Sequence, residues 1–523
     1  MRSQEIKNAL KKLGKLQLRP HQVDPIQNIL NGHSTMCIFP TAAGKSLIYQ
    51  VPTLVMNQLA VIITPLISLQ QDQIQQLTQY NLVAGRITEF YSAVPQSAGF
   101  LFATPELLQQ QHCIDFLTKV SNRLGFFVVD ECHLIIEWGN TFRKAYKQLD
   151  VISKFNKPIL ALTASVTSTQ AQKIIKELNL GAPQIYFTSF NRPNIHYSFH
   201  FTDNKFAILK NVISSFLASS PDNDSILIYA PTRSETDAIQ SSLCSIQDIH
   251  SYHAGLSPEQ REQTLQSWIQ NTVKLIVCTT AFSLGIDKPS VGLVVHFGIP
   301  KSSEQFYQES GRGGRNQKQC YSIVLSSTDD VKFQLSNITK LAENGPKESF
   351  YYLLKIAYFN KCRRQLLMDY FNSGKITQKS DICCDYCDNQ KQNNTFINKI
   401  FGWKSTSETE QDSISNQLTY FSTKRPSLSE LCGGYNDKFP ISNEQQQIDQ
   451  FNVLSDIIVD HFSGTMEQEI LLIDILKLKN YLLKKSPTIE KRNKITEKLI
   501  QLIMKNKQFN INQLMREALK LSM

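Results

Sequence analysis

Short, continuous apolar runs recur along the first 340 residues, separated by polar or amphipathic segments long enough to form helices. One series lies at 35–39, 59–64, 100–103, 126–130 and 159–164, and a second at 225–230, 274–280, 292–298 and 321–326. A strand that is apolar on both faces is typical of a parallel sheet covered by helices on both sides. The two series therefore predict an α/β protein with two such domains in tandem.

Residues 189–194 (SFNRPN) separate the two series, and Pro193 among polar neighbours predicts a hinge or linker there. We expect the first domain to cover 1–193 and the second 194–340. The remainder divides into a helical, cysteine-containing segment at 341–392, a polar linker at 393–450 and a basic helical region at 451–523.

Composition narrows the class of protein without identifying it. The 523 residues are 41% hydrophobic and 19% charged, which is ordinary for a globular chain and excludes a wholly disordered one. The formal net charge of +10 is compatible with a polyanionic partner. We expect no membrane partner, because no apolar run is long enough to span a bilayer. The cysteines lie mostly inside apolar runs, which favours reduced thiols in an intracellular compartment.

A small-residue loop follows the first apolar run and leads into an apolar helical start. It comprises Pro40, Thr41, Ala42, Ala43, Gly44, Lys45 and Ser46. Small residues let backbone N–H groups curl around phosphate oxygens, a Lys neutralises the β- and γ-phosphates, and a Ser hydroxyl holds Mg²⁺. Alone, the Gly-Lys-Ser tripeptide would favour an ordinary strand-to-helix turn.

Two adjacent carboxylates strengthen the phosphate-loop interpretation. The run 126–130 ends in Asp130-Glu131-Cys132-His133, so both acids lie at the carboxyl end of a buried strand, where α/β sheets bind ligands. Asp130 is suited to hold Mg²⁺ and Glu131 to position or deprotonate an attacking water. The alternative, a helix N-cap pair, is disfavoured by the phosphate loop upstream. The two motifs together predict nucleotide hydrolysis.

With these motifs, the chain resembles the RecQ family of ATP-dependent DNA helicases in helicase superfamily 2. The resemblance covers roughly residues 10–390 and adds motifs in family order. They include the 18–22 motif with Arg19 and Gln22, the 63–69 and 104–106 motifs, the 161–165 motif, the 190–195 junction, and in the second lobe 229–233, 253–256, 279–289 and 308–315. It implies two RecA-like lobes that sandwich ATP with Mg²⁺, and 3′→5′ unwinding of duplex DNA in repair, recombination or replication.

The resemblance assigns roles residue by residue. It implies nucleotide contacts by Arg19, Gln22, the phosphate loop, Gly285, Asp287 and Gln308, and DNA contacts by Thr104, Thr232, Arg233, His253 and Thr279. Arg312 and Arg315 would reach the γ-phosphate, one of them as an arginine finger. The chain departs from the family in having Ala42-Ala43 where Gly-Gly is usual, Gln70–Gln73 where a Lys is common, and Gly313 where Ala is usual.

An aromatic segment follows the acidic pair. Trp138, Phe142 and Tyr146 recur every four residues with Arg143 between them. Aromatic rings stack on bases of single-stranded DNA, and an Arg binds phosphate or joins the stack. The same spacing would suit a core-facing helical stripe. Its position beside Asp130–His133, where the RecQ family carries an aromatic-rich loop, favours the DNA-binding interpretation for Trp138, Phe142 and Arg143.

Four cysteines form a second candidate site. Cys362 lies in a helical run, and Cys383, Cys384 and Cys387 follow about twenty residues later. Four thiolates can complete a tetrahedral structural Zn²⁺ site. Asp381 is an alternative to Cys383, because adjacent side chains must diverge to reach one metal. The competing interpretation is that the cysteines are free or disulfide-bonded. We expect the neighbouring Arg363 and Arg364 to be solvated or to face DNA.

The resemblance implies a RecQ-type DNA helicase that acts on single-stranded and tailed duplex DNA, in the nucleus or in a bacterial cytoplasm. Region 451–523 is a candidate degenerate winged helix, phosphate contact or docking helix for a protein partner. Three rivals stay open: a DExH RNA helicase, a DNA-stimulated translocase that does not separate strands, and a non-enzymatic annealing scaffold.

Overall fold

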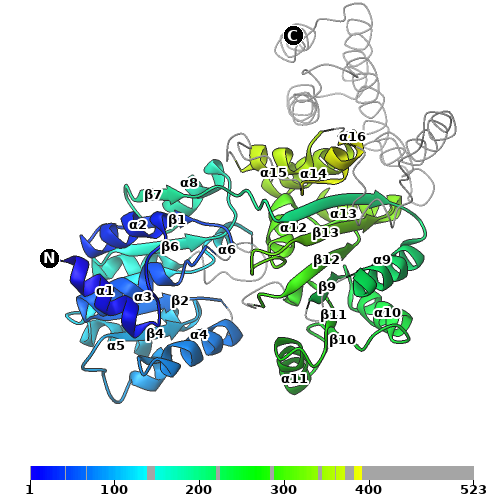
Figure 1. Ribbon diagram of the computed structural model, residues 1–523. Coiled ribbons are helices and arrows are strands. Elements are labelled where there is room, and N and C mark those ends of the chain that lie inside the picture. Colours follow the sequence, from blue (N-terminus) through cyan, green and yellow to red (C-terminus); the bar gives the residue numbers. More distant parts are fainter. Residues whose placement is uncertain are drawn as a thin grey trace, which may run out of the picture.

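The computed structural model describes residues 2–41, 43–65, 67–137, 148–219, 224–282, 288–339, 344–359, 361–371 and 382–391. These residues form two α/β lobes joined by a short connection, with a group of helices beside the second lobe (Figure 1). All strand pairs in both sheets are parallel. The prediction of two tandem parallel-sheet domains is confirmed.

The first lobe contains a seven-stranded sheet with the order β3-β4-β2-β5-β6-β1-β7. Its strands are β1 (Thr35–Ile38), β2 (Leu59–Ile63), β3 (Val83–Arg86), β4 (Gly99–Ala103), β5 (Leu124–Val129), β6 (Ile159–Thr163) and β7 (Gln184–Phe187). Its helices are α1 (Arg2–Lys12), α2 (Pro20–Leu30), α3 (Leu47–Met56), α4 (Ile67–Gln79), α5 (Gln111–Lys119), α6 (Leu134–Glu137) and α8 (Ser168–Glu177).

The second lobe contains a six-stranded sheet with the order β10-β11-β9-β12-β13-β8. Its strands are β8 (Ile195–Phe201), β9 (Ser225–Tyr229), β10 (Ile249–Tyr252), β11 (Leu275–Cys278), β12 (Val291–Phe297) and β13 (Cys320–Ser326). Its helices are α9 (Lys205–Ser219), α10 (Arg233–Leu243), α11 (Pro258–Ile269), α12 (Ser303–Ser310) and α13 (Thr328–Thr339).

The apolar runs form the centres of both sheets. Every residue of β1, β2, β4, β5 and β6 is buried, as is every residue of β9, β11 and β12. Burial of both faces explains why these strands appear in the sequence as continuous rather than alternating apolar runs. Because all strands are parallel, the loops at their carboxyl ends gather along one edge of each sheet.

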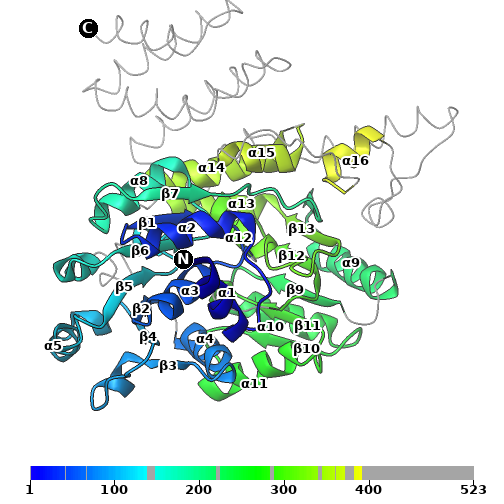
Figure 2. The same ribbon diagram turned by 60° about the vertical axis from the view of Figure 1, so that its left-hand side comes forward.

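A helical module (α14, α15 and α16) lies against the second lobe in both ribbon views (Figure 2). Its helices are α14 (Asn344–Tyr358), α15 (Arg363–Tyr370) and α16 (Asp385–Lys391). An isolated parallel bridge joins Tyr197 of β8 to Cys384, so the segment before α16 extends the edge of the second sheet. Asp388 of α16 lies 2.8 Å from buried His196 of β8.

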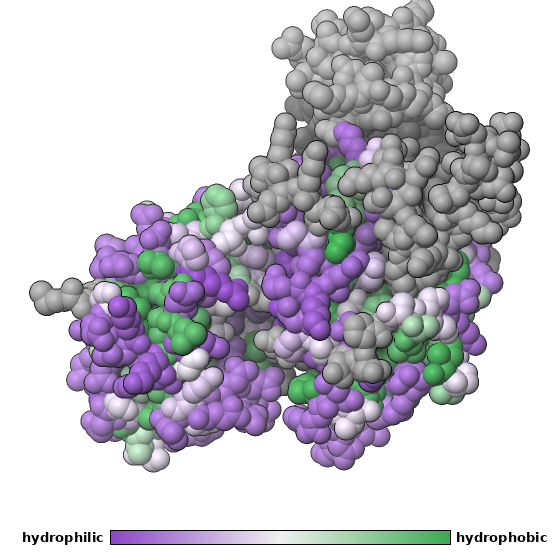
Figure 3. Space-filling model, in the orientation of Figure 1, coloured by the Kyte–Doolittle hydropathy of each residue, from purple (hydrophilic) through white to green (hydrophobic). Residues whose placement is uncertain are grey.

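The exposed face of the described residues is largely hydrophilic, with scattered apolar side chains on both lobes (Figure 3). The largest exposed hydrophobic fractions belong to Leu16 and to Phe187 on the edge strand β7. Among the described helices, none combines the length and apolar character needed to cross a membrane.

Several predicted features lie outside the described residues. They are Ala42, Gly285 and Asp287 of the predicted nucleotide site, the predicted DNA-binding residues Trp138, Phe142 and Arg143, the alternative ligand Asp381, and regions 393–450 and 451–523.

Candidate functional site

The phosphate loop connects β1 to α3 at the carboxyl edge of the first sheet. Gly44 has a φ of +79°, in the left-handed region that favours glycine. A Cβ added there would lie 2.5 Å from Gln22 Nε2, so both conformation and space require glycine. Lys45 Nζ donates to the carbonyl oxygen of Phe39 at 3.1 Å, which holds its ammonium across the loop.

Residues at the start of α2 form hydrogen bonds to this loop. Gln22 is only 1% exposed, and its Nε2 donates to the carbonyl oxygens of Gly44 (3.0 Å) and Ala43 (3.3 Å). Its Oε1 accepts the backbone N–H of Arg19 at 2.8 Å. His21, a member of the 18–22 motif for which no role was predicted, donates from Nε2 to the Ala43 carbonyl at 2.9 Å. The predicted nucleotide-contacting segment is therefore hydrogen-bonded directly to the phosphate loop.

The acidic pair stands at the carboxyl end of β5. Asp130 is 8% exposed, and burial together with the charge of Glu131 raises the pKa of its carboxyl to about 6, although Lys45 opposes the shift. Asp130 Oδ1 accepts the backbone N–H of Glu131 at 3.0 Å. Glu131 has a φ of +48°, which is uncommon for a residue with a Cβ. A raised pKa and a strained backbone together are features that cluster at functional sites.

His133 links the acidic pair to the second lobe. Its Nδ1 lies 3.0 Å from Thr163 Oγ1 and 3.4 Å from Glu131 Oε2. Across the interface, Gln308 Nε2 lies 3.1 Å from His133 Nε2 and 2.8 Å from Ser165 Oγ. If the Gln308 amide donates to Nε2, the ring proton is on Nδ1 and points toward Thr163 and Glu131. The predicted residue Gln308 thus contacts two first-lobe motifs.

The loop after α12, residues 311–315 (the 311–315 loop), approaches the phosphate loop. Thr41 Oγ1 donates to the carbonyl oxygen of Gly311 at 3.1 Å, and a Cβ on Gly311 would lie 2.7 Å from that hydroxyl. Arg312 follows directly and is buried, whereas Arg315 is half-buried. The predicted arginines therefore belong to a loop that touches the phosphate loop, although they are 267 or more residues away from Lys45 in sequence.

The unusual Gly313 has a structural explanation. A Cβ at this position would lie 2.1 Å from the sulfur of buried Cys320, at the start of β13. An alanine, which the family usually has here, would collide with this sulfur unless the neighbouring chain moved. Gly313 and Cys320 therefore fit together as a pair.

The remaining predicted DNA-contacting residues follow the carboxyl ends of strands. Thr104 follows β4, Thr232 and Arg233 follow β9, His253 follows β10 and Thr279 follows β11. Thr232 and Arg233 are exposed at the start of α10, where Thr232 Oγ1 accepts the N–H of Glu235 at 3.1 Å. His253 is buried, 3.3 Å from Asp237 Oδ1. These positions suit a surface across the carboxyl edges, and their contact with DNA stays a prediction.

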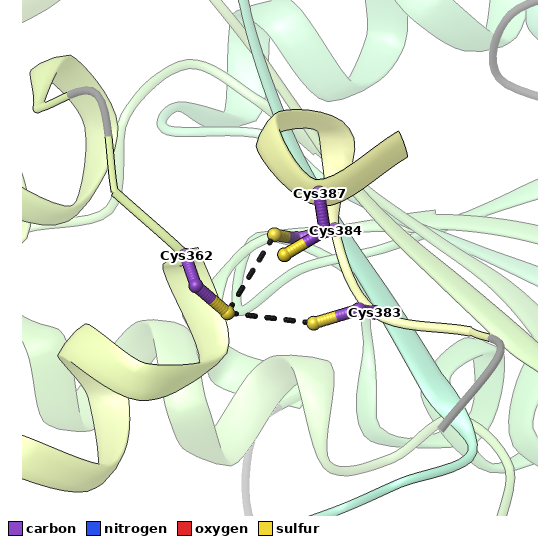
Figure 4. A group of neighbouring side chains, drawn as sticks. All are labelled: Cys362, Cys383, Cys384 and Cys387. Carbon is purple, nitrogen blue, oxygen red and sulfur yellow. Dashed lines mark hydrogen bonds between the residues drawn. The ribbon is translucent and has the colours of Figure 1, made fainter. Parts of the chain in front are cut away.

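The four predicted cysteines meet at one point between α15 and α16 (Figure 4). All are free thiols, and their sulfurs lie within 4.8 Å of one another. Cys362 Sγ is 3.4 Å from Cys383 Sγ and 3.9 Å from Cys384 Sγ. A tetrahedral site with Zn–S bonds of about 2.3 Å has sulfurs about 3.8 Å apart. The donor set and its spacing are compatible with zinc, and Cys383 and Cys384 diverge enough to join it.

The prediction that Arg363 and Arg364 are solvated or face DNA is wrong. They are 2% and 1% exposed. Arg363 Nε donates to Asp385 Oδ1 at 2.9 Å, and its Nη1 donates to the carbonyl of Ile356 at 2.8 Å. Arg364 Nη2 donates to the carbonyls of Ile195 and Ile382, both at 2.7 Å. Arg363 therefore connects α15 to α14 and α16, whereas Arg364 fixes the cysteine-bearing segments to β8 of the second lobe. A buried charge requires such partners.

Comparison with known proteins agrees with this geometry. Residues 19–174 match the DEAD/DEAH box helicase family, and residues 204–317 match the helicase conserved C-terminal domain. Among solved structures, Dbp5 of S. cerevisiae bound to RNA and ADP BeF3 is similar with a TM-score of 0.51 at 15% identity, covering 64% of this chain and 90% of its own. The DEAD-box helicase Mss116 bound to ssRNA gives 0.53 at 16% identity, covering 87% and 88%. These structures share the fold of a two-lobed helicase core.

Curated relatives are more closely similar in sequence. A putative ATP-dependent RNA helicase of Acanthamoeba polyphaga mimivirus is 34% identical over 73% of this chain and 71% of its own length. The ATP-dependent DNA helicase RecQ of Pasteurella multocida is 31% identical over 71% of this chain and 61% of its own length. The RecQ-like DNA helicase BLM of Xenopus laevis is 31% identical over 72% of this chain and 30% of its own length.

The fold and the site define a helicase of the two-lobed, ATP-dependent class. Within that class, the chain belongs to the RecQ family. The chain spans less than two thirds of the length of the Pasteurella and Xenopus relatives.

Proposed function

We propose that the protein is an ATP-dependent DNA helicase that moves 3′→5′ along one strand and unwinds duplex DNA. The observation that best supports this proposal is the contact of the 311–315 loop with Thr41 of the phosphate loop. This contact brings a basic segment of one lobe to the predicted phosphate site of the other, as an arginine finger requires. ATP hydrolysis and the closure of the lobes would then be coupled.

Each lobe contributes distinct groups to hydrolysis. The phosphate loop would bind the β- and γ-phosphates, with Lys45 neutralising their charge. Mg²⁺, held by Ser46 and Asp130, would neutralise charge on the phosphate oxygens. Glu131 would orient the attacking water and accept its proton, while Arg312 and Arg315 stabilise charge on the transferred group. Gln308, through its contact with His133, would couple the acidic pair to the second lobe.

The cysteine cluster would have a structural role. Zn²⁺ bound by Cys362, Cys383, Cys384 and Cys387 would cross-link the starts of α15 and α16 and leave no ligand position open for chemistry. The module's contacts with β8, including Asp388 with His196, would carry that stabilisation into the second lobe.

DNA as the substrate is supported by the curated RecQ relatives, whereas the name of the mimivirus relative favours RNA. The exposed Thr232 and Arg233 at the edge of the second sheet are suited to backbone phosphates of either strand type. We infer a site of action where DNA is found, the nucleus of a eukaryote or the cytoplasm of a bacterium.

Steady-state ATP hydrolysis with competing nucleic acids tests the proposal. We expect single-stranded DNA to stimulate hydrolysis strongly, with Lys45→Ala and Glu131→Gln abolishing the stimulated rate while still binding DNA. Single-stranded RNA should not stimulate hydrolysis to the same level. Added as a competitor, it should not lower the DNA-stimulated rate. Stimulation by RNA alone would establish the RNA helicase instead. Absence of hydrolysis from folded protein would favour the non-enzymatic scaffold.

A further inference from the structure

Arg192 lies in the connection between the last strand of the first lobe, β7, and the first strand of the second, β8. Its side chain is buried, with 7% exposed. Residues 189–194 were predicted to form a hinge or linker because of their polar composition and Pro193. A buried guanidinium in such a segment requires partners to offset its desolvation.

The partners of Arg192 are concentrated on one loop. Its Nη1 donates to the carbonyl oxygen of Gly311 at 3.2 Å, and its Nη2 donates to the carbonyls of Gly313 at 2.9 Å and Gly314 at 3.1 Å. These glycines flank Arg312 and directly precede Arg315. A planar guanidinium with donors in a fixed fork can bind several carbonyls at once, which a lysine ammonium cannot do in the same geometry.

The same guanidinium also reaches the phosphate loop. Arg192 Nη1 lies 3.5 Å from Thr41 Oγ1, and this hydroxyl donates to the Gly311 carbonyl that Arg192 also binds. Arg192 therefore lies where the junction, the phosphate loop and the 311–315 loop meet. A change in its position would alter the distance between phosphate loop and arginines.

Two further contacts hold the loop from the same side. Asn194 Nδ2 donates to the carbonyls of Gly314 and Lys318, both at 2.8 Å. Tyr307, near the end of α12, donates its hydroxyl to the carbonyl of Phe190 at 2.9 Å. The junction thus fixes the loop at its start, along its glycines and after Arg315.

We propose that Arg192 is a positioning residue for ATP hydrolysis, which holds the 311–315 loop so that Arg312 and Arg315 face the phosphate site. The inference rests on the proposed function, because it assigns Arg192 to the same hydrolytic step. Arg192 acts only through the two arginines, and its loss should therefore lower kcat more than it raises KM. A displacement of a catalytic group by about 1 Å can reduce the rate by about 10²-fold.

The decisive variant is Arg192→Lys, with Arg364→Lys as its matched control. Arg364 is equally buried and also donates to carbonyls of this region, those of Pro193 and Ile195, but its acceptors do not include the glycines of the 311–315 loop. We expect Arg192→Lys to lower the DNA-stimulated kcat by about 10²-fold, with KM for ATP changed less than about threefold. Arg364→Lys should lower the melting temperature and leave kcat of the folded fraction near the wild-type value.

A double-mutant comparison separates positioning from general stability. Combining Arg192→Lys with Arg312→Ala or with Arg315→Ala should cost little more than the more damaging single change, because the pair acts through one loop. If the fold-losses in kcat of the single variants multiply in both combinations, the proposal is overturned. It is also overturned if Arg192→Lys leaves kcat unchanged. If wild-type protein shows no DNA-stimulated hydrolysis, the proposed function itself fails, which is a different outcome.

If Arg192→Lys does not fold, Asn194→Ala tests the same loop. This variant removes the amide that donates to the carbonyls of Gly314 and Lys318, and it places no unpaired charge in the interior. We then expect a drop in kcat of about tenfold at nearly unchanged KM, an effect of the size of one lost positioning contact. An unchanged kcat in Asn194→Ala would overturn the proposal in that case.

Discussion

The predicted hydrolysis site and the attachment of the helical module are both rich in buried polar groups. The two regions differ in how these groups are partnered. At the hydrolysis site, burial raises the pKa of Asp130, and Glu131 has a left-handed backbone. In the module, Arg363 pairs with Asp385 and with backbone carbonyls, and Asp388 pairs with His196 at 2.8 Å.

The difference indicates what each region is for. Groups that will bind a ligand are held in positions that are costly without it, whereas the charged groups that attach the module are paired within the fold. Substitutions of the ligand-binding groups at the hydrolysis site should therefore reduce activity without destabilising the protein. Substitutions at the module should destabilise the protein and reduce activity only through unfolding.

The largest effect is expected at the two arginines of the 311–315 loop. Arg312→Ala and Arg315→Ala should each lower the DNA-stimulated kcat, and the variant lacking the arginine finger should lose about 10³-fold. Stopped-flow or steady-state hydrolysis measures this loss, and circular dichroism should show a melting temperature close to that of the wild type. If either variant melts many degrees lower, the contrast between the regions does not hold.

At the module, the strongest expected change is in stability. Asp385→Ala leaves the guanidinium of Arg363 without its carboxylate and takes an acceptor from the N–H of Phe199, so unfolding should become easier by about 3–5 kcal/mol. Urea titration checks the value. Asp248→Ala is the control, because the exposed Asp248–His250 pair should contribute almost nothing. A normal urea midpoint with a low kcat would place Asp385 in the catalytic machinery instead.

Asp130→Asn should separate stability from function at a single position. The carboxyl has a pKa of about 6 in the folded protein and about 3.9 when unfolded, so ionisation opposes folding. This penalty is full above pH 6, at about 3 kcal/mol, and shrinks as the pH falls toward 4. Without nucleotide or Mg²⁺, the variant should thus be more stable than wild type at pH 7.5 and nearly equal at pH 4, yet inactive. A stability difference independent of pH would contradict the buried-carboxylate account.

The smallest effect concerns packing beside the arginines. Gly313→Ala should cost about 1–3 kcal/mol, because its methyl group would meet Cys320 Sγ at 2.1 Å in an unrelaxed structure. Adding Cys320→Ala should restore most of the stability lost in Gly313→Ala, and Cys320→Ala alone serves as the control. Thermal melts of the four proteins would measure the coupling. If the second substitution brings no recovery, the two residues do not form a packing pair.

The sequence was most informative where one segment carries a complete local signal. Buried strands such as β1 and β5 appear as continuous apolar runs, and the phosphate loop and acidic pair follow them directly. Strands β3, β7, β8 and β10 were missed. β7 is an exposed edge strand, and β8 (IHYSFHF) includes polar residues, of which buried His196 finds its partner Asp388 only in the distant module.

Contacts between distant segments were beyond the reach of sequence patterns. Arg363 and Arg364 have the composition of a solvated basic pair, and only the fold brings Asp385 and the Ile195 carbonyl to them. Arg192 was matched to a junction motif, but its bonds to a loop some 120 residues away depend on how the lobes meet. The cysteine cluster was predicted because its ligand residues and their spacing carry the chemistry themselves.

Strand displacement on tailed duplexes tests whether the protein is a 3′→5′ DNA helicase. A 3′-tailed DNA duplex, a 5′-tailed DNA duplex and a 3′-tailed RNA duplex would be incubated with wild-type protein and Glu131→Gln in the presence of ATP and Mg²⁺. We expect the wild type to separate the 3′-tailed DNA efficiently and the other two duplexes poorly, and Glu131→Gln to separate none. ATP hydrolysis stimulated by DNA without any strand separation, or unwinding confined to RNA, would contradict this expectation.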